Sequence, residues 1–272
     1  MNESISSNEA AEMSGESGAQ HQNIARAALI LEALAGCARQ GLRLTDVSRI
    51  TGLSKTVAHR GLAGLVAHGM ATYENESARF FLGDRLFAWV GRAGERFELA
   101  ERAKPYLLKL AEELEDTIYF AIRRGDESVC YGRAEGSFPI KTLTLNVGDR
   151  RPLGIGSGSL AIAAYQDDAE VERLIREYSA ARARFQRADA LIRDDVRRAR
   201  EEGFSLTEGY FIEGMTGVGV PIRNSHGIAV ASLSVAAISK RLELPRRQQV
   251  AARLKVEAAL MERELSLLFA QL

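Results

Sequence analysis

The sequence of 272 residues lacks most features that mark metalloproteins, secreted proteins and membrane proteins. Its two cysteines, Cys37 and Cys130, lie far apart without nearby histidine or cysteine, so buried free thiols are expected rather than a disulfide or a metal site. No apolar run is long enough to span a membrane. The amino terminus has neither the basic start nor the apolar core of an export signal, so a cytoplasmic protein that makes no membrane contact is expected.

An excess of one charge is also missing, because 36 lysine and arginine residues balance 36 aspartate and glutamate residues. This balance argues against a nonspecific coat on nucleic acid. The distribution is uneven, however. Residues 24–92 hold nine basic and five acidic residues, a net charge of about +4, which is the sign expected of a domain that faces DNA. HExxH, a phosphate-binding loop and GxSxG are all absent, so no cofactor is expected and an enzyme is disfavoured.

The most informative stretch is residues 44–68, LTDVSRITGLSKTVAHRGLAGLVAH. Its first half has apolar residues at helical spacing, with Thr45 able to cap the first turn. The dipeptide Gly52-Leu53 fits a sharp turn, and Ser54 is a good N-cap for a second helix. In that helix Ala58, Leu62 and Leu65 share one face. The pattern therefore predicts a helix-turn-helix.

The opposite face of the second helix has side chains that suit DNA. Lysine and arginine reach guanine edges or phosphates, threonine and valine offer methyl groups to thymine, and a helix N-terminus attracts phosphate. The predicted DNA-binding residues are Thr45, Ser54, Lys55, Thr56, Val57, His59 and Arg60. The alternative is an ordinary helical hairpin with a basic face. Residues 70–86 favour DNA binding, because they predict a wing of two strands around a turn at Glu74–Ser77, with Arg79 placed to meet the DNA backbone.

These runs resemble the IclR family of bacterial transcriptional regulators. The likeness rests on ARAALILEALA, LTDVSRITGLSKTVAHRGLAGL and RFFLGDRLF, and it continues through LAERAKPYLLKLAEELEDTIYFAI to the end of the chain. Gly61 and Gly64 depart from the pattern, since relatives more often have leucine and a hydroxyl residue there. Each glycine costs a helix about 1 kcal/mol relative to alanine. The second helix is therefore either softer than usual or packed closely against a neighbour.

The expected fold class is α+β, with an N-terminal winged helix-turn-helix domain, a linker helix and a GAF-like effector-binding domain. Residues 1–22 lack lysine, arginine and an apolar period, so a disordered tail is expected. The expected boundaries are 23–83 for the DNA-binding domain, 84–98 for the linker and 99–272 for the effector domain. A break is expected near Phe97–Leu99. Phe87 and Trp89 on the linker favour a dimer contact or domain packing over an aromatic ligand site.

Residues 117–272 predict the strands and helices of the effector domain. Strands are expected at 117–122, 128–133 and 140–147, and a glycine-rich turn, GIGSGS, leads into an apolar helix. Two charged amphipathic helices follow at 169–181 and 188–202. Three further strands come next, around FSLTEG, GMTGVGVPIR and GIAVASLSVAAI, before a long helix that opens at Pro245.

The resemblance implies an effector pocket in this domain. Backbone N–H groups of Ser157 and Gly158, at a helix start, are expected to hold an anion. The family's remaining pocket positions fall on Leu143, Leu145, Thr207, Glu208, Gly217 and Ser234. Alanine at position 236 removes one of two paired serines, and Leu160 replaces a common lysine. A small organic acid effector is therefore expected, with a less polar, bulkier or aromatic acid favoured by these changes.

The expected function is that of an effector-responsive regulator on a palindromic double-stranded DNA operator, acting as a dimer or a dimer of dimers. The competing hypothesis is a small-molecule enzyme in the C-terminal domain, using Ser157 or Ser234 with Glu208 and His226. No base stands at a recognisable spacing from either serine, so the regulator is favoured.

Overall fold

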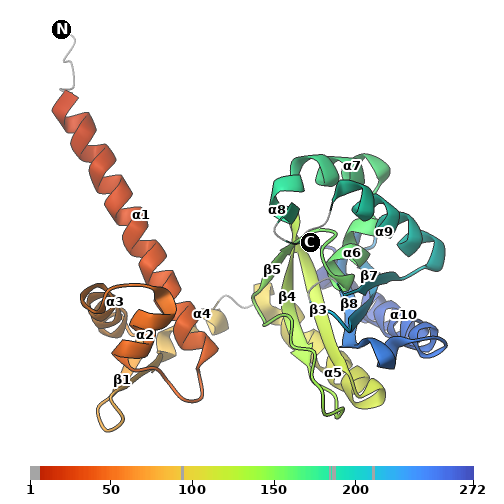
Figure 1. The fold of residues 1–272 in the computed structure, drawn as a ribbon, viewed down its shortest axis with the longest axis horizontal. Helices are drawn as coiled ribbons and strands as arrows, with labels where there is room; N and C mark the ends of the chain where they lie inside the picture. The colour runs from red at the N-terminus through yellow and green to blue at the C-terminus, as the bar shows by residue number, and fades with distance from the viewer. Residues whose placement is uncertain (1–6, 93–94, 184, 186–187, 210–211) are drawn as a thin grey trace. The chain divides into compact units, whose positions relative to one another are not determined.

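The computed structural model describes residues 7–92, 95–183, 185, 188–209 and 212–272. The chain forms two compact units, Met1–Arg96 and Phe97–Leu272 (Figure 1). Among the described residues, no helix combines the length and the apolar character needed to cross a bilayer.

The first unit is a winged helix-turn-helix, as predicted. Its α2 and α3 are joined by Gly52 in the left-handed conformation, with φ of 71°. The apolar stripe of α3 is buried against α1, and a bridge between Leu42 and Phe80 ties the wing to the loop after α1. The elements are α1 Ser7–Gly36, α2 Leu44–Thr51, α3 Lys55–Ala67, β1 Ala71–Glu74, β2 Arg79–Leu82 and α4 Asp84–Arg92.

The expected disordered tail is wrong from Ser7 onward, because α1 begins there and runs to Gly36. Residues 8–22 include many alanine, glutamate and glutamine residues, and these are strong helix formers that extend a helix already nucleated by the packed segment behind them. Residues 1–6 lie outside the described part of the chain.

The start of α2 also differs from the prediction. Thr45 is the second residue of the helix and not its cap, since α2 begins at Leu44. The Asp46 carboxylate instead accepts a hydrogen bond from the Arg43 N–H at 3.2 Å. The glycine at position 61 marks a close approach, because a Cβ there would lie 2.5 Å from Ile30 Cδ1. Gly64 has open space around it.

The linker region consists of α4 followed by α5 Glu95–Leu114. The break predicted near Phe97–Leu99 therefore falls inside α5, which begins earlier than expected. Phe87 and Trp89 of α4 are 81% and 44% exposed, and the Arg85 guanidinium lies 5.5 Å from the centre of the Trp89 ring.

The second unit is built on a six-stranded antiparallel sheet in the order β5-β4-β3-β8-β7-β6. The strands are β3 Thr117–Arg124, β4 Glu127–Ala134, β5 Arg150–Pro152, β6 Ser205–Glu208, β7 Met215–Arg223 and β8 Ala229–Ile238. The strand expected at 140–147 is wrong. Residues 140–147 form a loop that pairs with no strand and is called the strap below. The third strand of this unit along the chain is instead the short β5.

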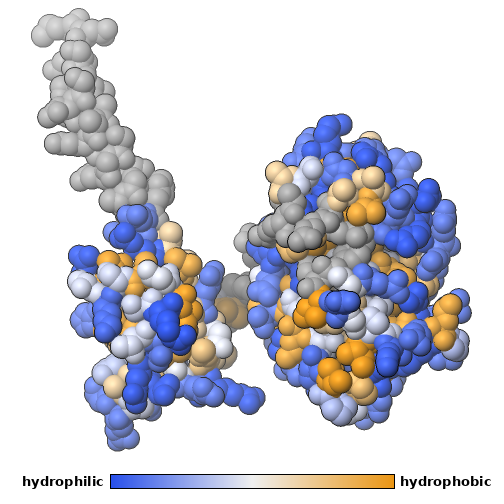
Figure 2. Space-filling model, viewed as in Figure 1, coloured by the Kyte–Doolittle hydropathy of each residue, from blue (hydrophilic) through white to orange (hydrophobic). Residues whose placement is uncertain are grey.

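The helices of this unit cover both faces of the sheet, with α5 and α10 on one face and α6, α7 and α9 on the other (Figure 1). On the face shown in Figure 2, the second unit is mainly hydrophilic, with small hydrophobic patches. The helices are α6 Ser157–Ala164, α7 Asp168–Glu177, α8 Ser179–Ala183, α9 Asp189–Glu202, the 3-10 helix η1 Ser239–Leu242, α10 Arg246–Glu264 and α11 Ser266–Phe269.

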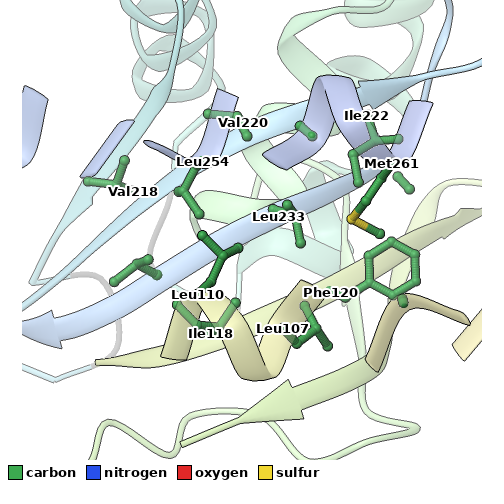
Figure 3. Packing of buried hydrophobic residues seen from close by; sticks show 14 of the residues in the cluster. Leu107, Leu110, Ile118, Phe120, Val218, Val220, Ile222, Leu233, Leu254 and Met261 are labelled. Atoms are coloured by element: carbon green, nitrogen blue, oxygen red, sulfur yellow. The ribbon is translucent and has the colours of Figure 1, made fainter. Parts of the chain in front are cut away.

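The main apolar core fills the space between the sheet and the pair α5 and α10. Ile118 and Phe120 of β3 point toward Leu107 and Leu110 of α5, with Leu254 of α10 nearby (Figure 3). Alternate residues of a strand face opposite sides, so the neighbours of these large residues must point to the other face. That other face carries small and hydroxyl side chains, and α6 packs on it.

Candidate functional site

The exposed face of α3 has its polar side chains at the N-terminal end of the helix. Lys55, Thr56, His59 and Arg60 are exposed, while Val57 is half-buried. Farther along the same face stand Ala63, Gly64 and Ala67, which offer no hydrogen-bonding group. Base-edge contacts of a helix-turn-helix come from the start of the second helix. The first turns of α3, called its polar reading end below, therefore carry the polar side chains. The small residues that follow leave room for a partner to lie close to the helix.

The start of α3 is capped as predicted. The Ser54 hydroxyl oxygen accepts a hydrogen bond from the Val57 N–H at 3.4 Å. The turn before it is fixed by the Ser48 hydroxyl, which donates to the Leu53 carbonyl at 2.7 Å. Both bonds orient the exposed end of α3.

An open groove of about 780 Å³ lies between α3, the start of α2 and the wing. Thr45 and His59, both predicted, line it together with Arg43 and Tyr73, which the sequence reasoning missed. Arg43 stands at the amino end of α2, where unpaired N–H groups also attract phosphate. An arginine directly before the start of a predicted helix was the sequence signal for a phosphate contact at this position.

Arg79 of the wing has a structural partner. Its Nη1 donates to the carbonyl oxygens of Gln40 and Gly41, at 3.1 and 2.9 Å. The side chain thus holds the loop after α1 against β2. A guanidinium has five N–H donors, so these bonds leave the phosphate-contact hypothesis open.

The second candidate site is a cavity of about 50 Å³ where the start of α6 meets the sheet. Of the eight predicted effector residues, the structure gathers six around it: Leu145, Ser157, Gly158, Thr207, Gly217 and Ser234. The helix start has Gly156 as its N-cap, with φ of 87° and no side chain that caps the helix. The first N–H groups of a helix have no acceptor within it, so those of Ser157 and Gly158 are available to a ligand.

The small residues of the sheet allow this helix start to come close. A Cβ on Gly217 would lie 2.6 Å from the Ser157 hydroxyl oxygen, and one on Gly219 would lie 2.6 Å from the Ser157 carbonyl oxygen. The Ser205 hydroxyl donates to that carbonyl at 2.6 Å. Ser232 is fully buried, and its hydroxyl has no hydrogen-bond partner among the described residues. The cavity therefore sits beside a row of hydroxyl groups.

Two of the predicted effector residues lie outside the cavity. Leu143 is 50% exposed, because in the strap 140–147 it turns outward while Thr142 turns inward. Glu208 is exposed at the end of β6 and pairs with Arg247 of α10 at 2.5 Å. Strand alternation places its neighbour Thr207 on the cavity side instead.

The cavity also has residues that the sequence reasoning did not find, above all Tyr119 and Arg151. The Tyr119 hydroxyl donates to the Thr142 carbonyl at 2.5 Å and accepts from the Thr144 N–H at 3.1 Å. The Arg151 Nη2 donates to the Thr144 carbonyl at 2.7 Å. These two side chains hold the strap over the sheet. The sequence signal for Arg151 was the pair of arginines shortly before the glycine-rich turn, because strand alternation turns one of the two side chains inward.

The arrangement does not resemble a hydrolytic centre. His226 is exposed in the turn between β7 and β8, and Glu208 is bound to Arg247, so neither approaches Ser157 or Ser234. The described residues contain no cluster of histidine, cysteine, aspartate and glutamate that would hold a metal ion. The two cysteines differ from each other: Cys130 is buried as predicted, while Cys37 is only half-buried.

Comparison with known proteins gives a consistent result. Residues 23–75 match the IclR helix-turn-helix domain, and residues 92–262 match the bacterial transcriptional regulator IclR C-terminal domain. The chain is 26% identical to the regulator XynR of Escherichia coli over 225 residues, which is 82% of this chain and 88% of XynR. It is 29% identical to the glycerol operon regulatory protein of Streptomyces griseus, covering 81% of this chain and 86% of that protein.

Solved structures share the fold. The IclR protein of Thermotoga maritima superposes with a TM-score of 0.72 at 17% identity, over 90% of this chain and 99% of that one. An IclR homologue from Microbacterium hydrocarbonoxydans, solved in complex with 4-hydroxybenzoate, gives a TM-score of 0.69 at 21% identity, over 89% of this chain and 98% of that one.

Proposed function

The chain belongs to the IclR family of bacterial transcriptional regulators, and we propose that it binds a palindromic DNA operator as a homo-oligomer whose operator affinity changes when a small organic acid occupies the cavity beside α6. The family consists of regulators and not enzymes, so the enzyme hypothesis is set aside.

The DNA part of the proposal is supported by the polar reading end of α3. We infer base contacts from Lys55, Thr56 and Arg60, with Val57 contributing its methyl groups. We infer phosphate contacts from Arg43 and His59, the two basic residues among the mainly apolar lining of the groove between α3 and the wing. Base contacts specify the sequence, whereas phosphate contacts set the position of the protein on DNA.

The homo-oligomer is supported by α4. Phe87 and Trp89 are exposed on it, and Val90 is 48% exposed, although α4 is too short to be stable alone. We infer that a second copy of the chain covers this face. A two-fold dimer presents two α3 helices related by symmetry, and therefore reads two inverted half-sites.

The proposed effector site is supported by the start of α6, which has a glycine cap and unpaired N–H groups and faces a row of hydroxyl groups across the cavity. Such a site suits a carboxylate. The cavity of about 50 Å³ is smaller than the roughly 150 Å³ that holds a benzene ring, which favours a compact aliphatic acid over an aromatic one.

Selection from a pool of random duplex DNA tests the proposed operator. The full-length protein is expected to enrich sequences with two inverted half-sites about one helical turn, or a multiple of it, apart. Arg60→Ala should weaken binding to the selected site by about 1–3 kcal/mol, whereas Arg197→Ala, an exposed arginine of α9, should leave it unchanged. Enrichment of unpaired single sites would contradict the dimeric reading.

A further inference from the structure

The cavity beside α6 is smaller than the acids it is proposed to bind. Its volume of about 50 Å³ holds three to five water-sized groups at roughly 10–15 Å³ each. Succinate and most other small organic acids have more non-hydrogen atoms than this. One wall of the cavity must therefore move before such an acid can enter.

The walls of the cavity differ in how they are held. Strands β3, β7 and β8 form one side, and backbone hydrogen bonds join them to one another along the sheet. The start of α6 forms another side and packs closely on these strands. The strap contributes Thr144 and Leu145, and no backbone group of residues 140–147 pairs with a strand in the described part of the chain. The strap is therefore the wall that moves at the least cost.

The strap is fixed by backbone hydrogen bonds just outside its two ends. Before it, the Phe138 N–H donates to the Glu115 carbonyl at 2.9 Å. After it, the Gly148 N–H donates to the Cys130 carbonyl at 2.8 Å. Such a segment can lift away from the sheet between two fixed points while the strands on either side keep their pairing.

Apolar burial contributes little to holding the strap down. Ile140, Leu143 and Val147 are each at least half exposed, so these side chains turn away from the sheet. Removal of apolar surface from water is the main force that holds a segment against a core. With most of its apolar side chains turned outward, the strap depends chiefly on hydrogen bonds.

Those hydrogen bonds come from side chains of the strands beneath. Besides Tyr119 and Arg151, the strap is held by Arg133 of β4, whose Nη1 donates to the Leu145 carbonyl at 3.1 Å and to the Asn146 side-chain oxygen at 3.2 Å. Arg133 does not line the cavity. It can therefore be changed without altering the surface that meets the acid.

We propose that the strap is the movable wall of the effector cavity: side-chain hydrogen bonds from Tyr119, Arg133 and Arg151 hold it down in the empty protein, and the acid binds the form in which the strap is displaced. This inference rests on the proposed function, because it concerns the same cavity. A ligand that binds only a minor form has its apparent affinity reduced by the fraction of protein in that form. Loosening the strap should therefore tighten acid binding. A compact acid displaces the strap less than an aromatic ring does, in agreement with the size preference proposed for this cavity.

Arg133→Met in the full-length protein tests the inference, with succinate as the probe. Calorimetry should show about tenfold tighter succinate binding than in the wild type, because two hydrogen bonds from a charged donor no longer oppose displacement of the strap. Without acid, hydrogen exchange of residues 140–147 should be about tenfold faster in the variant. In the wild type, saturating succinate should likewise speed exchange of the strap.

Two variants serve as controls. Glu135→Gln removes the ion-pair partner of Arg133, at 3.1 Å, and leaves both bonds to the strap. Arg150→Met removes an arginine of β5 that pairs with Glu127 at 2.7 Å. Both should match the wild type in succinate affinity and in exchange of the strap. Exchange of β7 and β8 should be equal in all four proteins, which separates local opening from global unfolding.

Equal or weaker succinate binding by Arg133→Met overturns the inference, as does slower exchange of the strap when succinate binds the wild type. In those cases an acid still occupies the cavity, so the proposed function stands. Malonate and butyrate extend the test to other compact acids. If none of the three acids binds the wild type or alters its operator affinity, the proposed function fails and the inference fails with it.

Discussion

Gly158 of α6 lies so close to Ser234 of β8 that a Cβ on the glycine would stand 3.0 Å from the serine hydroxyl oxygen. The Ser232 hydroxyl oxygen would lie at the same distance. This close approach lets the N–H groups of the helix start and the hydroxyl groups of the sheet act on one ligand. It also means that even a methyl group on Gly158 would make these hydroxyl groups shift by a few tenths of an ångström.

Gly158→Ala should therefore weaken binding of the effector acid about tenfold, which corresponds to ~1.4 kcal/mol. Overpacking should also lower the free energy of unfolding by about 1 kcal/mol. Calorimetry and urea unfolding measure the two effects. Gly64→Ala, which adds a methyl group in a helix of the other unit where no atom lies within 4 Å of the Cβ position, is the control and should leave the acid affinity unchanged. Unchanged acid affinity in a folded Gly158→Ala protein would place the acid elsewhere.

The two glycines of α3 should respond in opposite ways to alanine. Gly64→Ala should raise the free energy of unfolding by about 1 kcal/mol, because alanine is the better helix former and the space is open. Gly61→Ala should lower it by about 1 kcal/mol, because the new methyl group displaces the buried Ile30 side chain. Urea unfolding of the full-length protein without DNA compares them. A stabilised Gly61→Ala would show that the contact with Ile30 is not tight.

Arg79→Ala separates two roles of the wing. If Arg79 also touches a phosphate, the variant should bind all sequences more weakly and reduce the slope of log affinity against log salt by roughly one. Losing only the bonds to Gln40 and Gly41 would lower stability and leave the salt slope unchanged. Operator titrations at several salt concentrations measure the slope. A changed base preference would contradict the phosphate assignment.

The ion network at α7 predicts a stability loss in acid. Arg173 bonds hold the pKa values of Asp126 and Glu170 below their ordinary values of 3.8 and 4.5. Because these pKa values are lower in the folded state, the stabilisation is present above the ordinary values and is lost as pH falls through the folded ones. Arg173→Met should therefore flatten the fall in unfolding free energy below about pH 5. Arg176→Met, an exposed neighbour, should match the wild type. Equal acid slopes for Arg173→Met and wild type would contradict this account.

The local signals of the sequence predicted the first unit well. The turn at Gly52, the cap at Ser54 and the buried stripe of α3 each depend on residues within one or two helical turns, where spacing alone specifies the structure. Thr45 was misplaced because helix starts are uncertain by a residue or two. The helix at residues 7–22 was missed because the prediction considered only the composition of this segment. It did not consider that the packed helix after it could continue into the segment.

The cavity was harder to predict because its parts come from strands far apart in the sequence. Leu143 and Glu208 each lie next to a position that does face the sheet interior, and a shift of one residue reverses the face of an extended chain. Arg151 was missed because the third strand of this unit was expected at 140–147, whereas the structure has it at β5. Its place in the cavity depends on strand order, which no local pattern reveals.

The central claim is that acid in the cavity and operator on α3 are coupled, and one measurement tests it most directly. Operator affinity is titrated by fluorescence anisotropy at fixed salt and at increasing concentrations of a compact aliphatic acid, with succinate as the probe, for the wild type and for Gly158→Ala. The account predicts a change of about fivefold or more in wild-type operator affinity, because a ligand shifts the equilibrium through its different affinity for two states. Gly158→Ala should bind the operator normally without acid and should need about tenfold more succinate to reach half of the change. Acid binding to the wild type with no change in its operator affinity would contradict the claim.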